Sequence, residues 1–172
     1  LAGLRQTKQI DIHYLNADDG GYYRVEDLRR AIRPNTKLVA LTHASNVLGT
    51  VQPIQECGEI CRANNVLFLV DAAQTAGCWP IDIEQMKIDL LAAPGHKALF
   101  GPTGTGFLYV GPRAKVRPWR EGGTGSHSEE SGQPAELPDH LEAGTANVHG
   151  IAGLVAGLRF VRETTVESIQ TH

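Results

Sequence analysis

The fold class of this chain is indicated most clearly by residues 37–74, "KLVALTHASNVLGTVQPIQECGEICRANNVLFLVDAAQ". It begins with a short β-rich run (37–44), and a helix-like segment (53–65) follows that starts on Pro53 and ends in two asparagines. Proline suits the first turn of a helix, and asparagine suits its end. A nearly continuous apolar run then covers 66–70, as is typical of a strand buried on both faces of a parallel sheet. Strand, helix and strand at this spacing predict a βαβ unit.

The alternation continues on both sides of this stretch. Residues 8–15 alternate like a strand, and residues 24–33 place apolar side chains at helical spacing before Pro34. We therefore expect the α/β class, with a mostly parallel sheet and helices on both of its faces. Further along the chain, we predict strands at 88–94 and 104–111, a long exposed loop at 118–140 and a closing amphipathic helix at 148–163.

The composition is that of an ordinary globular protein. The chain has 172 residues and a net charge of −3, and it contains no run of more than two basic residues. This pattern offers no footprint for nucleic acid or a membrane surface. No apolar stretch approaches the roughly 18 residues of a membrane span, and no signal-peptide pattern is present. We expect a cytoplasmic protein whose three cysteines are small buried hydrophobes rather than parts of a disulfide framework.

Polar side chains gather where the predicted strands end. Asn46 follows one strand, Asp71 and Gln74 follow the next, and His96 and Lys97 follow the third. Ligands of parallel sheets collect at the carboxyl ends of the strands, so we expect these side chains to share one edge. An amine and a carboxylate are what pyridoxal 5'-phosphate requires. The lysine forms a Schiff base with its aldehyde, and the carboxylate keeps its ring nitrogen protonated.

Each of these residues also has a plainer explanation when it is taken alone. A lysine in a turn is commonly solvated, an aspartate after a strand commonly caps a helix, and Gln74 could lie on a helix surface. Asn46 and His96 could only brace turns, and we expect His43 to be packed or bonded within a turn. The glycine-rich segment at 101–106 is not a nucleotide loop, because neither a lysine nor a helix follows it.

Five segments match a known family in order along nearly the whole chain: RPNTKLVALTHASNVLGT (33–50), FLVDAAQTAG (68–77), GHKALFGPTGTGFLYV (95–110), REGGTGS (120–126) and LEAGTANVHGIAGL (141–154). The combination of "VDAAQ" followed by "GHK" is specific. By these segments the chain resembles the fold-type I, class V aminotransferases, and within them the group of cysteine desulfurases and selenocysteine lyases.

The resemblance implies a role for each candidate residue. Lys97 would carry the cofactor, Asp71 would pair with its pyridinium nitrogen, and Gln74 would lie beside its phenolic oxygen. Asn46 would reach the ring edge or the substrate carboxylate, and His96 would reach the phosphate. Thr145 resembles the threonine that contacts the phosphate of a second subunit's cofactor, which implies a homodimer with shared active sites.

The chain also departs from the family pattern. Relatives commonly carry serine or threonine two residues before the histidine, whereas this chain has Pro94, which offers neither a hydroxyl nor an amide N–H. Ala146 stands where proline is usual. The resemblance places further functional groups, including the sulfur-accepting cysteine, outside residues 1–172. We therefore expect a fragment of the cofactor-binding large domain that is inactive alone, with Cys57, Cys61 and Cys78 outside catalysis.

The expected activity of the intact protein is removal of sulfur or selenium from cysteine or selenocysteine to give alanine, with a possible sulfur-acceptor protein as partner. Another class V aminotransferase or a β-eliminating lyase would share every residue named above. A non-catalytic scaffold is the third reading, which the change at Pro94 motivates.

Overall fold

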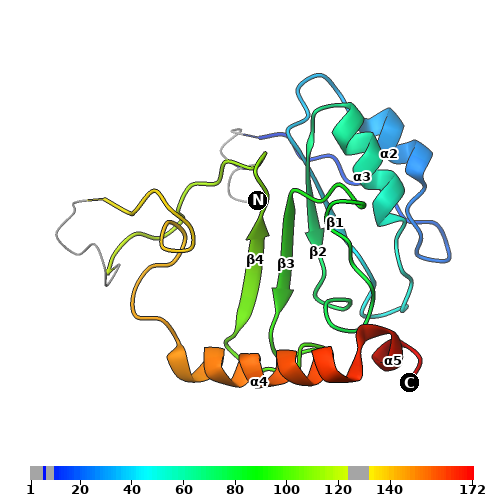
Figure 1. The fold of residues 1–172 in the computed structure, drawn as a ribbon. Helices are drawn as coiled ribbons and strands as arrows, with labels where there is room; N and C mark the ends of the chain where they lie inside the picture. Colours follow the sequence, from blue (N-terminus) through cyan, green and yellow to red (C-terminus); the bar gives the residue numbers. More distant parts are fainter. Residues whose placement is uncertain (1–5, 7–9, 124–131) are drawn as a thin grey trace.

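Four strands form one sheet in the computed structural model, which describes residues 6, 10–123 and 132–172 (Figure 1). The spatial order follows the chain: β1 (Leu38–Thr42), β2 (Leu67–Asp71), β3 (Leu90–Pro94) and β4 (Gly106–Val110). The strands β1, β2 and β3 are parallel, and β4 runs antiparallel to β3. The predicted α/β fold with a mostly parallel sheet is therefore confirmed.

The core lies between this sheet and two helices, α2 (Val25–Ala31) and α3 (Ile54–Ala63). Alternation along β2 turns Phe68 and Val70 toward the helices, and both are fully buried. Burying one such side chain contributes about 1.5–3 kcal/mol. The inner face of α3 carries Cys57 and Cys61, also fully buried, so both are packed hydrophobes as predicted, whereas Cys78 is only half-buried. Burial raises the pKa of Cys57 to about 11 and that of Cys61 to about 12, which keeps both thiols neutral.

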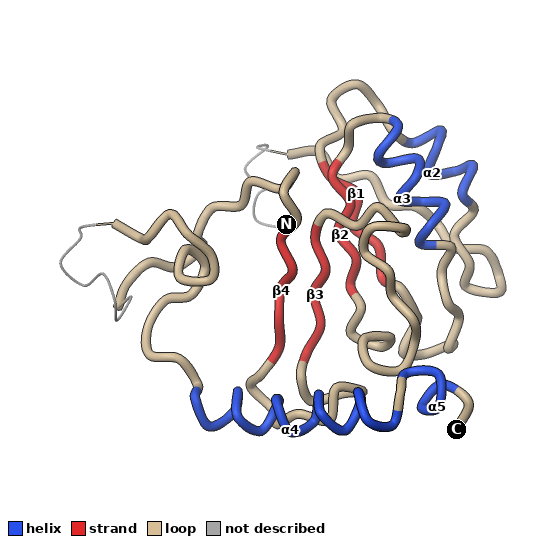
Figure 2. Tube along the Cα trace, in the orientation of Figure 1, coloured by secondary structure: helices blue, strands red, loops and turns tan. Residues whose placement is uncertain are grey.

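A long helix, α4 (Val148–Thr164), runs across the sheet at the ends of the strands, and Figure 2 shows it in blue below the red strands. Its buried residues are Gly150, Leu154, Gly157 and Val161. Of these residues, Leu154 faces the connection between β3 and β4, where it lies close to Gly95 and Gly101. The side chain of Asn147 caps the helix by accepting a hydrogen bond from the Gly150 amide at 3.0 Å. A short helix not foreseen from the sequence, α5 (Val166–Gln170), follows it.

One predicted segment differs from the element expected of it, and another is a loop as predicted. Residues 10–15, the described part of the predicted strand 8–15, form no strand. Alternation sets which side chains face a core, but a strand also needs a paired neighbour, and none of the described ladders includes these residues. Within the predicted loop 118–140, the described residues lack helix and strand, yet the His140 ring lies 2.6 Å from Pro134 O and 3.1 Å from Val116 O.

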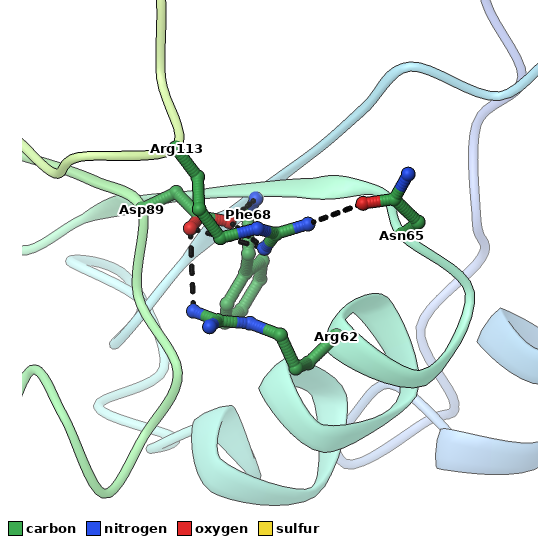
Figure 3. A network of polar contacts seen from close by, with 5 residues as sticks. All are labelled: Arg62, Asn65, Phe68, Asp89 and Arg113. Carbon is green, nitrogen blue, oxygen red and sulfur yellow. Dashed lines mark hydrogen bonds and ion pairs between the residues drawn. The ribbon is translucent and has the colours of Figure 1, made fainter.

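A buried ion-pair network closes the amino edge of the parallel strands (Figure 3). The Asp89 side chain is 3 % exposed and receives hydrogen bonds from Arg113 Nη1 at 3.0 and 3.1 Å and from Arg62 Nη2 at 3.3 Å. The Phe68 amide donates to the same carboxylate at 2.9 Å, and Arg113 also bonds Asn65 Oδ1 at 3.0 Å. Asp89 therefore has partners on a helix, on a neighbouring strand and on the segment after β4, and it joins all three.

Candidate active site

Three chain segments leave the sheet at its carboxyl edge, the opposite edge from Asp89. Asp71 is the last residue of β2, in register with Thr42 of β1 and Ala92 of β3. The His43 amide donates to Asp71 O at 2.9 Å, and the Ala72 amide donates to Ala92 O at 2.9 Å. The segment with Asn46, the segment with Gln74 and the segment with His96 and Lys97 therefore begin side by side.

The carboxylate of Asp71 is exposed and makes one local hydrogen bond. Its Oδ1 accepts from the Ala73 amide at 2.9 Å, which forms a turn directly after the strand. Within the described residues, no other protein group bonds this carboxylate. The turn therefore orients the side chain while one of its oxygens stays available to a ligand.

Lys97 lies in a tightly closed loop between β3 and β4. The loop begins at Gly95, whose amide donates to Thr105 O at 2.8 Å and whose carbonyl accepts from the Gly101 amide at 2.8 Å. Inside it, the Phe100 amide donates to Lys97 O at 2.9 Å, and Phe100 has a positive φ of 54°. The backbone is thus bonded at both ends and in the middle, while the Lys97 and His96 side chains are exposed.

The two carboxamides occupy different settings. Gln74 is half-buried in the turn after β2, and its carbonyl accepts from Cys78 Sγ at 3.2 Å. Asn46 is exposed in the 45–50 turn, where Ser45 Oγ accepts from the Val47 and Leu48 amides at 3.2 Å each. Ser45 therefore caps this turn, and capping does not explain the presence of Asn46.

Thr145 makes no described hydrogen bond with the other candidates. It is exposed and precedes Asn147, the residue that caps α4. Figure 1 shows that α4 begins on the β4 side of the sheet and ends on the β1 side. No contact among the described residues links Thr145 to Asp71 or Lys97. The structure brings five of the six candidates to one edge and leaves Thr145 on the segment that leads into α4.

His43 is a residue at this edge to which sequence analysis assigned no function. It is 2 % exposed, and its Nδ1 is buried without a hydrogen-bond partner. Burial lowers the pKa of His43 below its usual value of 6.5, so the ring is neutral near pH 7. The prediction of a packed histidine is confirmed. Its position directly after Thr42, the neighbour of Asp71 in β1, would not by itself have indicated burial.

The side chains at this edge fit pyridoxal phosphate by their chemistry. An exposed amine, a carboxylate with a free oxygen, two carboxamides and an imidazole supply a covalent anchor, a partner for a pyridinium and donors for anionic oxygens. Pro94 ends β3 opposite Gly106 and supplies no donor there. The described residues hold no group of three or more metal-ligating side chains, and none of the described helices is long and apolar enough to cross a membrane.

Comparison with known proteins agrees with this arrangement. The model of the aminotransferase class-V family matches residues 1–172. A probable cysteine desulfurase of Methanothermobacter thermautotrophicus is 38% identical over 171 residues, which cover 97% of this chain and 43% of the relative. The solved structure of the cysteine desulfurase CsdA from Escherichia coli has a TM-score of 0.85 and 30% identity, covering 96% of this chain and 43% of that one.

A further solved structure, of SspA in complex with cysteine, has a TM-score of 0.79 and 32% identity over 92% of this chain and 42% of its own. The chain thus spans less than half the length of the relatives it matches. Because the family model matches residues 1–172, and a solved relative aligns with 96% of the chain at a TM-score of 0.85, this chain belongs to the class V aminotransferase family.

Proposed function

We propose that this chain is the cofactor-binding part of a pyridoxal-phosphate-dependent cysteine desulfurase. The observation that carries the proposal is the placement of Lys97 and Asp71 on adjacent segments at the carboxyl edge, joined through the β2–β3 ladder. Relatives that carry the name cysteine desulfurase match nearly the whole chain, and one related structure holds cysteine itself. Together they support an amino-acid substrate bearing a thiol.

Each candidate side chain would have its own role toward the cofactor or the substrate. When bound, pyridoxal phosphate supplies an electron sink for the negative charge that develops on the substrate. The Asp71 carboxylate would hold the proton on the ring nitrogen, and the amides of Gln74 and Asn46 would donate to oxygens of the ring or the substrate. His96 would lie at the phosphate. Lys97 Nζ would anchor the cofactor and then move a proton at the substrate Cα.

The sulfur must pass to a thiol outside the described cysteine set. In the balanced reaction, cysteine and an acceptor thiol give alanine and a persulfide, so no external oxidant is needed. Cys57 and Cys61 are buried, and their raised pKa values keep them protonated. Cys78 is half-buried, burial also raises its pKa, and its Sγ donates to Gln74 O at 3.2 Å. We therefore place the acceptor on another segment or on a partner protein, in a cytoplasmic homodimer in which Thr145 reaches the cofactor phosphate of the second copy.

The test is to identify the lysine that holds the cofactor. The protein is incubated with pyridoxal phosphate, reduced with borohydride, digested and analysed by mass spectrometry. We expect the cofactor mass on the peptide that contains Lys97 and its loss in Lys97→Ala. Lys37→Ala is the matched control, because Lys37 is also exposed but lies at the opposite edge of the sheet, where its carbonyl accepts from the Leu67 amide.

The reaction products then distinguish the alternative activities. Alanine released from cysteine by the protein that carries these residues supports desulfuration. Pyruvate with ammonia would instead indicate β-elimination, and a keto acid with transfer of the amino group would indicate an aminotransferase. Equal cofactor attachment in wild type and Lys97→Ala would overturn the assignment of Lys97, and no specific attachment in wild type would favour the scaffold.

A further inference from the structure

The backbone of the Lys97 loop is contacted from two sides by glycines. From one side comes Gly77, in the turn after β2 that also carries Gln74, with a positive φ of 96°. A Cβ placed at position 77 would overlap Ala98 O and lie 2.7 Å from the carbonyl carbon of that residue. Real Cβ atoms essentially never come so close to backbone atoms, so the turn and the loop touch only because residue 77 has no side chain.

From the other side comes Gly157 in the third turn of α4. A Cβ at position 157 would overlap Leu99 O and lie 2.7 Å from both the carbonyl carbon and the carbonyl oxygen of Phe100. One turn further on, the Phe160 ring meets the Phe100 ring edge to face at 5.0 Å between centroids. Helix α4 therefore contacts the loop through backbone at Gly157 and through an aromatic pair at Phe160.

The three contacted carbonyls belong to Ala98, Leu99 and Phe100, which directly follow Lys97. The loop has little freedom to retreat from either contact. Its ends are bonded to Thr105 and to each other, Leu99 is buried, and Phe100 already holds an unfavourable positive φ. A side chain at 77 or 157 would therefore displace the backbone that directly follows Lys97 rather than a flexible side-chain end.

We propose that Gly77 and Gly157 are positioning residues for Lys97, which hold its loop between the turn after β2 and helix α4. Through Gly77, the backbone that places Asp71 and Gln74 also sets the position of the lysine loop. Through Gly157, the helix that begins after Thr145 sets it from the other side. This inference rests on the proposed role of Lys97 as the residue that holds the cofactor.

The test compares Gly157→Ala with Gly153→Ala on the same helix. A Cβ at 153 would lie 3.1 Å from the Pro102 ring, which is a side-chain contact rather than a contact with the backbone of residues 98–100. We expect Gly157→Ala to attach the cofactor to Lys97 more slowly by on the order of 100-fold, as expected for a displacement of about 1 Å at a reacting group. The pH midpoint of the visible absorbance of the bound cofactor should shift as well, and Gly153→Ala should match wild type in both.

Phe160→Leu serves as a second variant in case Gly157→Ala does not fold. Both rings of the Phe100–Phe160 pair are about half exposed, so the core does not depend on them, while the loop loses one of its contacts with α4. We expect slower attachment at Lys97 with an unchanged urea midpoint. Gly77→Ala should shift the same pH midpoint, because its contact lies on the Asp71 side of the loop.

The two proposals fail in different ways. No cofactor on Lys97 in the wild-type protein contradicts the proposed function itself. Normal attachment in wild type, together with wild-type rates and pH midpoints in folded Gly157→Ala, Gly77→Ala and Phe160→Leu, contradicts the positioning role alone. Slower attachment in Gly153→Ala equal to that in Gly157→Ala would also overturn it, since α4 packing in general would then account for the effect.

Discussion

The two edges of the sheet each present an aspartate, and the fold treats the two carboxylates in opposite ways. At the amino edge, Asp89 is buried and bonded to Arg62, Arg113 and the Phe68 amide. At the carboxyl edge, Asp71 is exposed and accepts one bond from the Ala73 amide. A carboxylate whose bonds are all made within the protein stabilises the fold, whereas one that keeps an oxygen free can bind a ligand. Exposure and unused hydrogen-bonding capacity, rather than residue type, distinguish the candidate site from the structural network.

The largest expected effect is that of removing the buried carboxylate. Asp89→Ala leaves the Phe68 amide without its acceptor and leaves the half-buried Arg113 without its carboxylate partner. Breaking such a pair costs about 3 kcal/mol of unfolding free energy. Urea denaturation followed by circular dichroism measures this loss. A midpoint within error of the wild-type value would show that the network adds nothing to the fold.

The two arginines of the network should contribute unequally. The Arg113 side chain is 24% exposed, contacts both oxygens of Asp89 and bonds Asn65, whereas that of Arg62 is 43% exposed and makes one contact at 3.3 Å. We expect Arg113→Ala to cost about 2 kcal/mol and Arg62→Ala about 0.5 kcal/mol in unfolding free energy, since exposed pairs contribute little. The reverse order in urea denaturation would contradict the ranking by burial.

At the carboxyl edge, His43 should make stability depend on pH. Burial lowers the pKa of the folded-state ring below 6.5, so the unfolded chain binds the proton more readily. The contribution of the neutral His43 ring to the free energy of unfolding is fully present above about pH 6.5. It is lost as the pH falls toward the lowered folded-state pKa. We expect wild type to lose more unfolding free energy than His43→Leu between pH 7 and pH 5. Parallel curves for the two proteins would contradict this prediction.

The conservative change Asp71→Asn should have the smallest effect on stability. In Asp71→Asn the side-chain oxygen can still accept from the Ala73 amide, so the unfolding free energy without cofactor should change by less than about 0.5 kcal/mol. Asp71→Ala loses that bond and should cost about 1 kcal/mol. We also expect pyridoxal phosphate to stabilise wild type, and Asp71→Asn should lose most of that added stabilisation. An equal cofactor-induced rise in the urea midpoint would remove Asp71 from the site.

The sequence was most informative where local periodicity and edge rules coincide. The βαβ pattern predicted β1, α3 and β2, and the rule that ligands gather at strand carboxyl ends selected Asp71, Asn46 and the Lys97 loop. The sequence was less informative where contacts between residues far apart in the chain determine the structure. Residues 10–15 alternate without a strand partner, α5 depends on the turn at Thr165, and the roles of Gly77 and Gly157 appear only when backbone distances are known. A glycine in a helix gives no sign of which carbonyl it will meet.

The closure of the loop between β3 and β4 limits how far the amine of Lys97 can travel. Pro94 pairs with Gly106 at the end of the β3–β4 ladder, and the Gly101 amide bonds Gly95 O just beyond it, so no hinge lies on either side of the lysine. The Lys97 amine can therefore move only as far as its own four-carbon side chain allows. A molecule that reacts with Lys97 would therefore have to bind within reach of that side chain.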